Sequence, residues 1–364
     1  MSVTQEIILK ALSTVNDPDL KRDLVSLGMI KDVSVSDKGV AFTVVLTTPA
    51  CPLKEMIRQD CMDAVEKVVG KDTPIDITIT SSVTSTRNNA PLLPQVKNIV
   101  AIASGKGGVG KSTVTSNLAV ALAQQGAKVG LIDADIYGPS IPTMFNCEFE
   151  QPEVKEINGK TMIIPLEQYG VKLMSIGFLT PPDSAVVWRG PMASAALKQF
   201  FSETVWDELD YLLIDLPPGT SDIHLTLVQT VPVTGAVIVT TPQKVAIADA
   251  NKGLAMFRQP QINVPVLGVI ENMAYFTPEE LPDNKYYIFG KDGGKNLSEK
   301  YGVPFLGQVP LVQGIRESGD SGLPAVMKEG PTAEAFRTLA ESLARQIAIR
   351  NANLAETKRV ELKV

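Results

Sequence analysis

The first 80 residues carry two kinds of hydrophobic spacing. Helical spacing predicts a helix over about 4–15 and a second helix after Pro52, in which apolar side chains recur with the period of a helix face as far as Gly70. Three short segments have the composition and alternation of strands: 30–36, 40–46 and 75–80. This order predicts a small α/β domain of αββαβ topology over residues 1–82.

A different pattern begins near residue 98. Short, strongly apolar runs alternate here with longer stretches of helical spacing; the runs are 99–103, 128–132, 211–214, 236–240 and 266–270. Strands that are apolar on both faces are typical of a parallel sheet covered by helices. We therefore expect an α/β domain with a doubly wound, mostly parallel sheet over residues 98–352, ending in a helix over about 332–351.

The two predicted domains are separated by a segment rich in Ser, Thr, Asn and Pro. Residues 83–97 follow neither spacing and include Pro91 and Pro94, so we interpret them as a linker. The last residues, 353–364, are too highly charged to be placed and are assigned to a tail.

Composition and charge argue against several classes of protein. Hydrophobic residues make up 44% of the 364 positions, which is enough to bury sizeable cores. The net charge of -6 argues against a large nucleic-acid surface. No apolar run approaches the roughly 20 residues that span a bilayer, and the N-terminus lacks the layout of a signal peptide. We expect a cytoplasmic protein without nucleic-acid or membrane partners.

One glycine-rich segment lies between the first strand of the predicted sheet and the next helix. It reads GKGGVGKST and consists of Gly105, Lys106, Gly107, Gly108, Val109, Gly110, Lys111, Ser112 and Thr113. The segment fits G-x-x-x-x-G-K-[ST], the phosphate-binding loop of P-loop NTPases, whose backbone N–H groups and helix N-terminus surround phosphate oxygens. In such a loop Lys111 reaches the β- and γ-phosphates and the Ser112 hydroxyl coordinates Mg²⁺. The sequence therefore predicts a site for ATP and Mg²⁺.

Three aspartates follow apolar strands of the same predicted sheet. Asp215 ends the run 211–214, and Asp133 and Asp135 follow the run 128–132. The carboxyl ends of parallel strands meet at the edge of the sheet that binds ligands. We expect Asp215 to hold the magnesium ion through water, and one of the other two to orient or activate the attacking water.

The general loop pattern does not demand a lysine at position 106. With Lys106, the string GKGGVGKST resembles the deviant loop of the signature-lysine ATPases, which include MinD, ParA, ArsA and the nitrogenase iron protein. The resemblance implies a homodimer in which Lys106 contacts the partner's nucleotide and stabilises transition-state charge. It also implies that Asp135 positions the water and that Asp133 supports the magnesium shell. Lys106, Lys111 and Asp135 are thus the expected catalytic residues.

Further motifs make the chain similar to the Mrp/ApbC iron–sulfur cluster carriers. They are DADIYGPS at 133–140, WRGPM at 188–192, DLPPGTSD at 215–222 and ENMAYF at 271–276. The N-terminal domain, with TTPACP at 47–52, resembles the PaaD-like domain often fused ahead of such ATPases. The resemblance implies ATP hydrolysis and the transfer of iron–sulfur clusters from a scaffold to apoprotein acceptors. It also implies that Asn272 contacts the adenine.

The chain departs from these carriers after Phe276. Many of them have C-x-x-C at this point, with which two copies bridge one cluster, whereas this chain has no cysteine after Cys147. Cys61 lies on the apolar face of its predicted helix and is expected in the core. Cys51 precedes Pro52, a favoured first helical residue, so its sulfur is expected at a helix N-terminus, where thiolates are stabilised. Cys51 is therefore the candidate cluster ligand.

Two other hypotheses stay open at this point. A MinD- or ParA-like positioning ATPase would act at a membrane or on DNA, and a nucleotide-dependent adaptor would recruit partners without holding a cluster. The single histidine, His224, is expected to be structural, and Cys147 has no assigned role. Trp188 and Met192 are expected either in the core or in an exposed patch for a partner.

Overall fold

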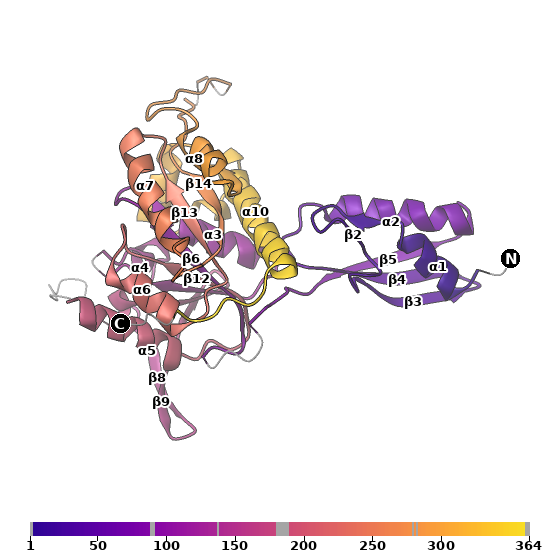
Figure 1. The fold of residues 1–364 in the computed structure, drawn as a ribbon, viewed down its shortest axis with the longest axis horizontal. Helices are drawn as coiled ribbons and strands as arrows, with labels where there is room; N and C mark the ends of the chain where they lie inside the picture. The colour runs from indigo at the N-terminus through magenta and orange to yellow at the C-terminus, as the bar shows by residue number, and fades with distance from the viewer. Residues whose placement is uncertain are drawn as a thin grey trace. The chain divides into compact units, whose positions relative to one another are not determined.

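The computed structural model describes residues 3–87, 92–136, 138–179, 189–278, 280–281 and 283–360. The chain divides into two compact units, drawn in Figure 1. The first consists of Met1–Thr84 with Ala348–Leu354, and the second of Ser85–Ile347 with Ala355–Val364. This division groups residues 348–354 with the first unit, whereas the sequence assigned them mainly to the second.

The first unit is a three-stranded sheet packed against two helices. Its elements are α1 (Gln5–Leu12), β1 (Asn16–Asp17), β2 (Arg22–Asp23), β3 (Ile30–Ser36), β4 (Gly39–Leu46), α2 (Lys54–Val69) and β5 (Ile75–Ser81). The sheet has the order β3-β4-β5, antiparallel and then parallel. Alternate side chains of β4, such as Phe42 and Val44, are buried in one core with Ile8 and Leu12 of α1 and Ile57 of α2. The αββαβ order is therefore observed, with the short β1–β2 ladder added.

The second unit is built on an eight-stranded sheet of order β10-β11-β7-β12-β6-β13-β14-β15. Its strands are β6 (Val96–Ser104), β7 (Val129–Asp133), β10 (Leu166–Gln168), β11 (Val171–Ser175), β12 (Leu209–Asp215), β13 (Gly235–Thr240), β14 (Val266–Glu271) and β15 (Phe305–Gln308). All the pairs are parallel except β10 with β11. The predicted doubly wound, mostly parallel sheet is confirmed.

Helices lie on both faces of this sheet (Figure 1). They are α3 (Lys111–Gln124), α4 (Ile141–Met144), α5 (Gly190–Ser202), α6 (Asp222–Thr230), α7 (Lys244–Phe257), α8 (Gly293–Tyr301), α9 (Gln313–Asp320) and α10 (Pro331–Asn353), with 3₁₀ turns at Ile176–Phe178 and Ala325–Met327. Every residue of β7, β12 and β13 is buried. Burial on both sides explains why these strands are apolar throughout.

A hairpin that the hydrophobic pattern does not predict protrudes from the second unit (Figure 1). It is formed by β8 (Glu153–Ile157) and β9 (Lys160–Ile164), and all of β8 is exposed. Because neither face of β8 is buried, its residues do not show the alternation that marks a half-buried strand.

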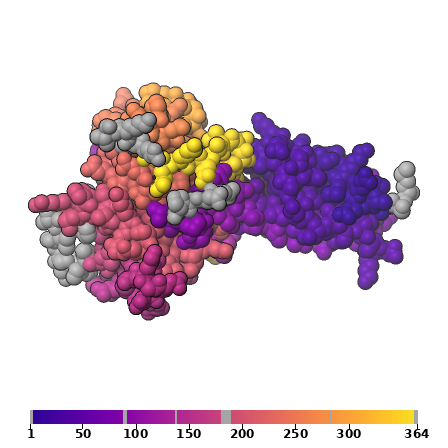
Figure 2. All heavy atoms as spheres, turned by 60° about the horizontal axis from the view of Figure 1, so that its bottom comes forward, coloured from indigo at the N-terminus to yellow at the C-terminus, as the bar shows by residue number. Residues whose placement is uncertain are grey.

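The segments predicted as linker and tail contain buried residues. The guanidinium of Arg87 donates to the carbonyl oxygens of Leu92 and Leu93, both at 3.2 Å, and to that of Val96. Its burial lowers its pKa to about 10. Val360 is also buried, and its N–H donates to the Val228 carbonyl of α6 at 2.9 Å. Figure 2 shows the C-terminal residues as yellow spheres on the surface.

Within the described residues, no helix is long and apolar enough to cross a membrane. Trp188 and the last four residues, 361–364, lie outside the described residues, whereas Met192 is 46% exposed on α5.

Candidate functional site

The glycine-rich loop connects the end of β6 to the start of α3, as the pattern requires. Gly108 and Gly110 have φ of +80° and +77°, which lie in the left-handed region that favours glycine. A Cβ on Gly105 would lie 2.0 Å from the carbonyl carbon of Asp249 in α7. The first glycine is therefore needed because the loop packs directly against the backbone of α7.

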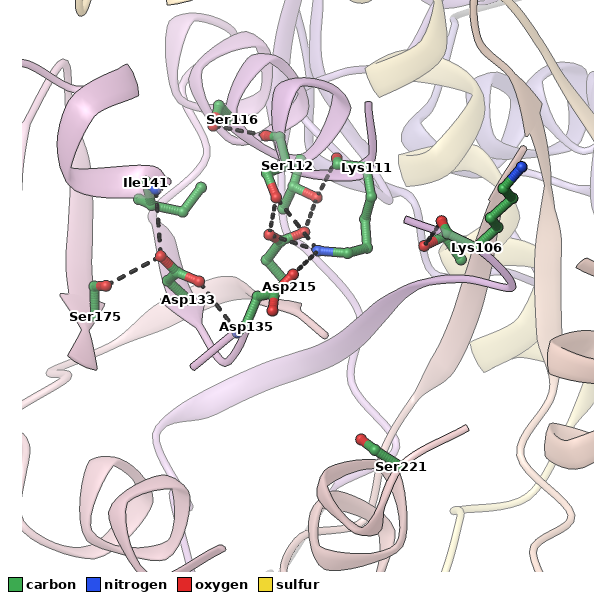
Figure 3. A network of polar contacts seen from close by, with 12 residues as sticks. Lys106, Lys111, Ser112, Ser116, Asp133, Asp135, Ile141, Ser175, Asp215 and Ser221 are labelled. Atoms are coloured by element: carbon green, nitrogen blue, oxygen red, sulfur yellow. Dashed lines mark hydrogen bonds and ion pairs between the residues drawn. The ribbon is translucent and has the colours of Figure 1, made fainter. Parts of the chain in front are cut away.

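The ammonium of Lys111 lies between two of the predicted aspartates (Figure 3). Its Nζ is 2.8 Å from Asp215 Oδ2 and 3.6 Å from Asp135 Oδ2, and the lysine is only 6% exposed. The structure thus brings together three side chains that lie on three separate segments of the sequence. A buried cation between two carboxylates satisfies charges that would otherwise be costly to bury.

Asp215 is the centre of this network. Its Oδ2 accepts a hydrogen bond from Ser112 Oγ at 2.5 Å, and its Oδ1 accepts one from Thr115 Oγ1 at 2.7 Å. Asp215 is the last residue of β12 and is fully buried. The structure therefore holds the predicted magnesium residues Ser112 and Asp215 in direct contact.

Asp133 is the last residue of β7 and has a different set of partners. Its Oδ2 accepts from Ser175 Oγ at 3.0 Å and from the N–H of Ile141 at 3.3 Å, and its Oδ1 accepts from the N–H of Asp135 at 3.2 Å. Burial, with the nearby charge of Asp215, raises the pKa of Asp133 to about 7. Its contacts anchor the loop that carries Asp135 and leads to α4.

Asp135 lies further out than Asp133, on the loop after β7. Burial raises the pKa of this carboxyl, while the charge of Lys111 acts in the opposite direction. Its side chain is 16% exposed, compared with complete burial of Asp133. Of the two, Asp135 is the one placed to meet a water molecule or a phosphate at the loop.

The donor set at the loop suits Mg²⁺. This ion prefers oxygen ligands, commonly one or two from the protein together with water and phosphate oxygens. Ser112 Oγ and Asp215 Oδ2 supply such oxygens beside the phosphate loop. In the part of the chain that the structure describes, no three His, Cys, Asp or Glu side chains form a metal-binding group of their own. The residues therefore fit an ion that arrives with a nucleotide.

Lys106 has none of the contacts that hold Lys111. Its carbonyl oxygen accepts from Ser104 Oγ at 3.1 Å, but its exposed side chain makes no hydrogen bond or ion pair with any described residue. Figure 3 shows the ammonium of Lys106 pointing away from the aspartates. The structure thus separates this lysine from the site formed by its own chain.

A cavity of about 600 Å³ adjoins the phosphate loop. Its lining includes Gly110 and Thr113 of the loop and the predicted base-binding residue Asn272. The Nδ2 of Asn272 donates to the Val109 carbonyl at 2.8 Å, which fixes the orientation of the amide. Sequence reasoning missed the apolar walls of this cavity: Met144, Met273, Pro310, Leu311, Val312 and Ile315. Residues 310–312 follow β15, a strand too short to be predicted, so no signal marked them.

The candidate cluster ligand Cys51 is not in the first helical turn. The helix α2 begins at Lys54, with Leu53 as its N-cap, so Pro52 is not the first residue of the helix. Cys51 therefore lies in the loop that precedes α2. Cys51 is half-buried, at the edge of the core of the first unit. Cys61 is fully buried in this core, and burial raises its pKa to about 12.

Two further residues are structural. Cys147 is buried, and its thiol donates to the Pro142 carbonyl at 3.5 Å. His224 is 1% exposed and forms a capping box with Ser221 at the start of α6. The Nδ1 of His224 accepts from the N–H of Ser221 at 3.2 Å, so the neutral ring carries its proton on Nε2. Burial lowers its pKa to about 4.

Two family models match the chain. Residues 95–344 match the NUBPL iron-transfer P-loop NTPase model, and residues 5–77 match an iron-sulfur cluster assembly protein model. The chain is 47% identical to the iron-sulfur cluster carrier protein of Synechocystis sp. over 351 residues, 95% of this chain and 99% of that protein. It is 42% identical to the iron-sulfur cluster carrier protein of Escherichia coli over 345 residues, 94% and 92% of the two chains.

The second unit is similar to a solved structure. A nucleotide-binding protein from Archaeoglobus fulgidus, in complex with ADP, aligns with a TM-score of 0.56 at 38% identity. The alignment covers 65% of this chain and 91% of that one.

Proposed function

The chain belongs to the family of NUBPL iron-transfer P-loop NTPases, and on this premise we propose that it is an ATP-hydrolysing carrier of iron–sulfur clusters. The observation that supports ATP turnover most directly is the network of Lys111, Asp215, Asp135 and Ser112 at the phosphate loop. The relatives are named iron-sulfur cluster carrier proteins, which supports an iron–sulfur cluster as the cargo. These relatives also favour a carrier over a positioning ATPase.

ATP binding exchanges the partners of Lys111. The lysine leaves Asp215 and turns to the β- and γ-phosphates, while Ser112 and Asp215 hold Mg²⁺. Bound there, Mg²⁺ neutralises charge that develops on the phosphates. Asp135, released from Lys111, orients the attacking water, and Asp133 holds the loop of Asp135 in place through its contacts with Ser175 and Ile141.

The cavity beside the loop accepts the base. Because Nδ2 of Asn272 already donates to Val109, its Oδ1 is the atom left to accept a hydrogen bond. An acceptor suits the exocyclic amine of adenine and disfavours the carbonyl of guanine at the same position. The apolar walls formed by Met273 and Leu311 suit a flat aromatic ring. ATP is therefore the proposed nucleotide.

The exposed Lys106 supports a homodimer. Its ammonium has no hydrogen-bond or ion-pair partner among the residues that the structure describes, and it points away from the aspartates of its own phosphate site (Figure 3). In the proposed dimer, Lys106 of the partner subunit completes each site by stabilising charge on the transferred phosphoryl group.

The cluster is the cargo and passes from a scaffold to apoprotein acceptors. The chain has three cysteines, of which Cys61 and Cys147 are buried. Cys51, half-buried in the first unit, is thus the cysteine best placed to contribute a thiolate, and two subunits would supply two. Outside thiols such as glutathione, or a partner protein, complete the ligand set.

ATP hydrolysis tests the nucleotide part of the proposal. Wild-type protein is expected to hydrolyse ATP only with Mg²⁺, and Lys111→Ala to abolish turnover. Lys128→Ala is a suitable control because it removes a surface lysine that pairs with Glu208 away from the loop. Mg²⁺-independent phosphate release, or a fully active Lys111→Ala variant, would contradict the proposal.

Anaerobic reconstitution tests the cargo. Wild type incubated with iron, sulfide and glutathione is expected to develop the absorption and Mössbauer spectra of a cluster and to transfer it to an apoprotein. Cys51→Ser is expected to lose this capacity, and Cys147→Ala to keep it. If wild type forms no cluster under any of these conditions, the protein is instead an adaptor that works without a cluster of its own.

A further inference from the structure

Thr115 lies one helical turn after Lys111 in α3, beyond the residues that the phosphate-loop pattern specifies. Its side chain is fully buried. The hydroxyl oxygen is 2.7 Å from Asp215 Oδ1 and 2.9 Å from the carbonyl oxygen of Lys111. A threonine at this position thus bonds to the carboxylate at the centre of the nucleotide site.

The two oxygens of Asp215 have different partners. Oδ2 faces the loop, where Lys111 Nζ lies at 2.8 Å and Ser112 Oγ at 2.5 Å. Oδ1 faces the helix, and among the described residues only Thr115 donates a side-chain hydrogen bond to it. Together with the contacts of Oδ2, this bond restrains the rotation of the buried carboxylate about the Cβ–Cγ axis.

We propose that Thr115 is a positioning residue for Mg²⁺. It holds Oδ1, so that Oδ2 still faces Ser112 after Lys111 has moved to the phosphates. The inference rests on the proposed function, in which Ser112 and Asp215 hold the ion. Hydrogen bonds that orient a metal-binding side chain typically affect metal affinity by about 10- to 100-fold when they are removed.

The Thr115 hydroxyl can be compared with a neighbouring hydroxyl in the same helix that bonds to the helix backbone but not to a carboxylate. Serine and threonine inside helices commonly donate to the carbonyl four residues earlier. Ser116 does so at 2.8 Å to Ser112, and its other contact is Met144 Sδ at 3.4 Å rather than a carboxylate. Ser116→Ala therefore removes the local bond and leaves Asp215 untouched.

ADP binding measured by calorimetry across a range of MgCl₂ concentrations, and in EDTA, tests the inference. The Mg²⁺ midpoint is the MgCl₂ concentration at which half of the Mg²⁺-dependent gain in ADP affinity is reached. Thr115→Val, which keeps the side-chain shape, is expected to raise this midpoint at least about tenfold. ADP affinity in EDTA is expected to stay at the wild-type value. Thr115→Ser, which keeps the hydroxyl, and Ser116→Ala are both expected to match wild type. Thr115→Ala provides the comparison if the valine variant does not fold.

A wild-type Mg²⁺ midpoint in the variants that lack the hydroxyl would overturn the inference. So would an equal loss of ADP affinity with and without Mg²⁺, because Thr115 would then support the loop and not the ion. Wild-type protein that binds Mg²⁺ and ADP but does not hydrolyse ATP would refute the proposed function. The Mg²⁺ midpoints would still decide the role of Thr115, so the two failures are distinguishable.

Discussion

At the scale of single residues, the two lysines of the phosphate loop differ in their surroundings. Lys111 is 6% exposed and is held by Asp215 and Asp135, so it belongs to the site of its own chain. Lys106 is exposed and makes no side-chain hydrogen bond or ion pair with a described residue, so the contact proposed with the partner subunit would break neither kind of interaction. The general loop pattern names only the first of them.

The role proposed for Lys106 predicts that Lys106→Ala lowers the rate of ATP hydrolysis by about a hundredfold or more. ADP affinity is expected to be unchanged because the side chain lies away from its own site. Steady-state phosphate release and ADP titration provide the two measurements.

Mixing two inactive variants tests whether this lysine acts across the dimer. In a mixed dimer of Lys106→Ala and Asp135→Ala subunits, one site keeps its own Asp135 and receives Lys106 of the partner subunit. Partial recovery of hydrolysis is therefore expected on mixing. No recovery beyond the sum of the separate variants would show that Lys106 does not act in trans.

At the scale of elements, the packing of the phosphate loop against α7 determines which of its glycines can be replaced by alanine. Gly105→Ala is expected to destabilise the second unit by about 1–3 kcal/mol, because the added Cβ overlaps the backbone at Asp249. The matched change Gly107→Ala meets its nearest atom, Pro218 Cγ, at 3.8 Å and is expected to leave stability unchanged. Thermal denaturation compares the two, and equal melting temperatures would contradict the close packing.

The capping box of α6 makes stability depend on pH. The pKa of His224 is about 4 in the folded protein, compared with 6.5 for an ordinary histidine. The unfolded chain therefore takes up a proton at higher pH than the folded one, and stability present above pH 6.5 is lost as the pH falls towards 4. From pH 7 to pH 5 this contribution falls by about 2 kcal/mol.

His224→Gln removes this dependence and keeps a capping box, since glutamine is favoured at the same helix position. Urea unfolding followed by tryptophan fluorescence reports on the second unit, which contains both tryptophans. The variant is expected to lose less stability than wild type between pH 7 and pH 5. The raised pKa of Asp133 acts in the opposite direction but is common to both proteins. Parallel losses would rule out His224 as the titrating group.

The sequence predicts an element well when its burial produces a clear hydrophobic pattern or when it carries a known motif. The apolar runs ending at Asp133 and Asp215 were predictable because β7 and β12 are buried on both faces. The helix start at Lys54, two residues after Pro52, was not, because proline occurs both before and within a first helical turn. The base cavity could not be predicted, since apolar side chains from distant segments form its walls without a motif.

At the scale of the whole molecule, two separate cores predict separable activities. The first unit has its own core around Phe42 and Ile57, and the phosphate loop and base cavity consist of residues of the second unit alone. Deletion of residues 1–82 is therefore expected to preserve ADP affinity and ATP hydrolysis while removing cluster transfer, because it removes Cys51. Calorimetry and a transfer assay on the shortened chain measure the two effects. Loss of ADP binding would show that the second unit depends on the first.

The ion pair between Lys111 and Asp215 links the two ligands of the site thermodynamically. A nucleotide that draws Lys111 away leaves a buried carboxylate without its counter-charge, which is costly until a cation replaces it. Each ligand therefore strengthens the binding of the other, and reciprocity requires the same factor in both directions. If the chain binds ATP and Mg²⁺ as proposed, we therefore expect the loop to respond more strongly to the two ligands together than to either one alone. It would then report the presence of their complex and not of either component.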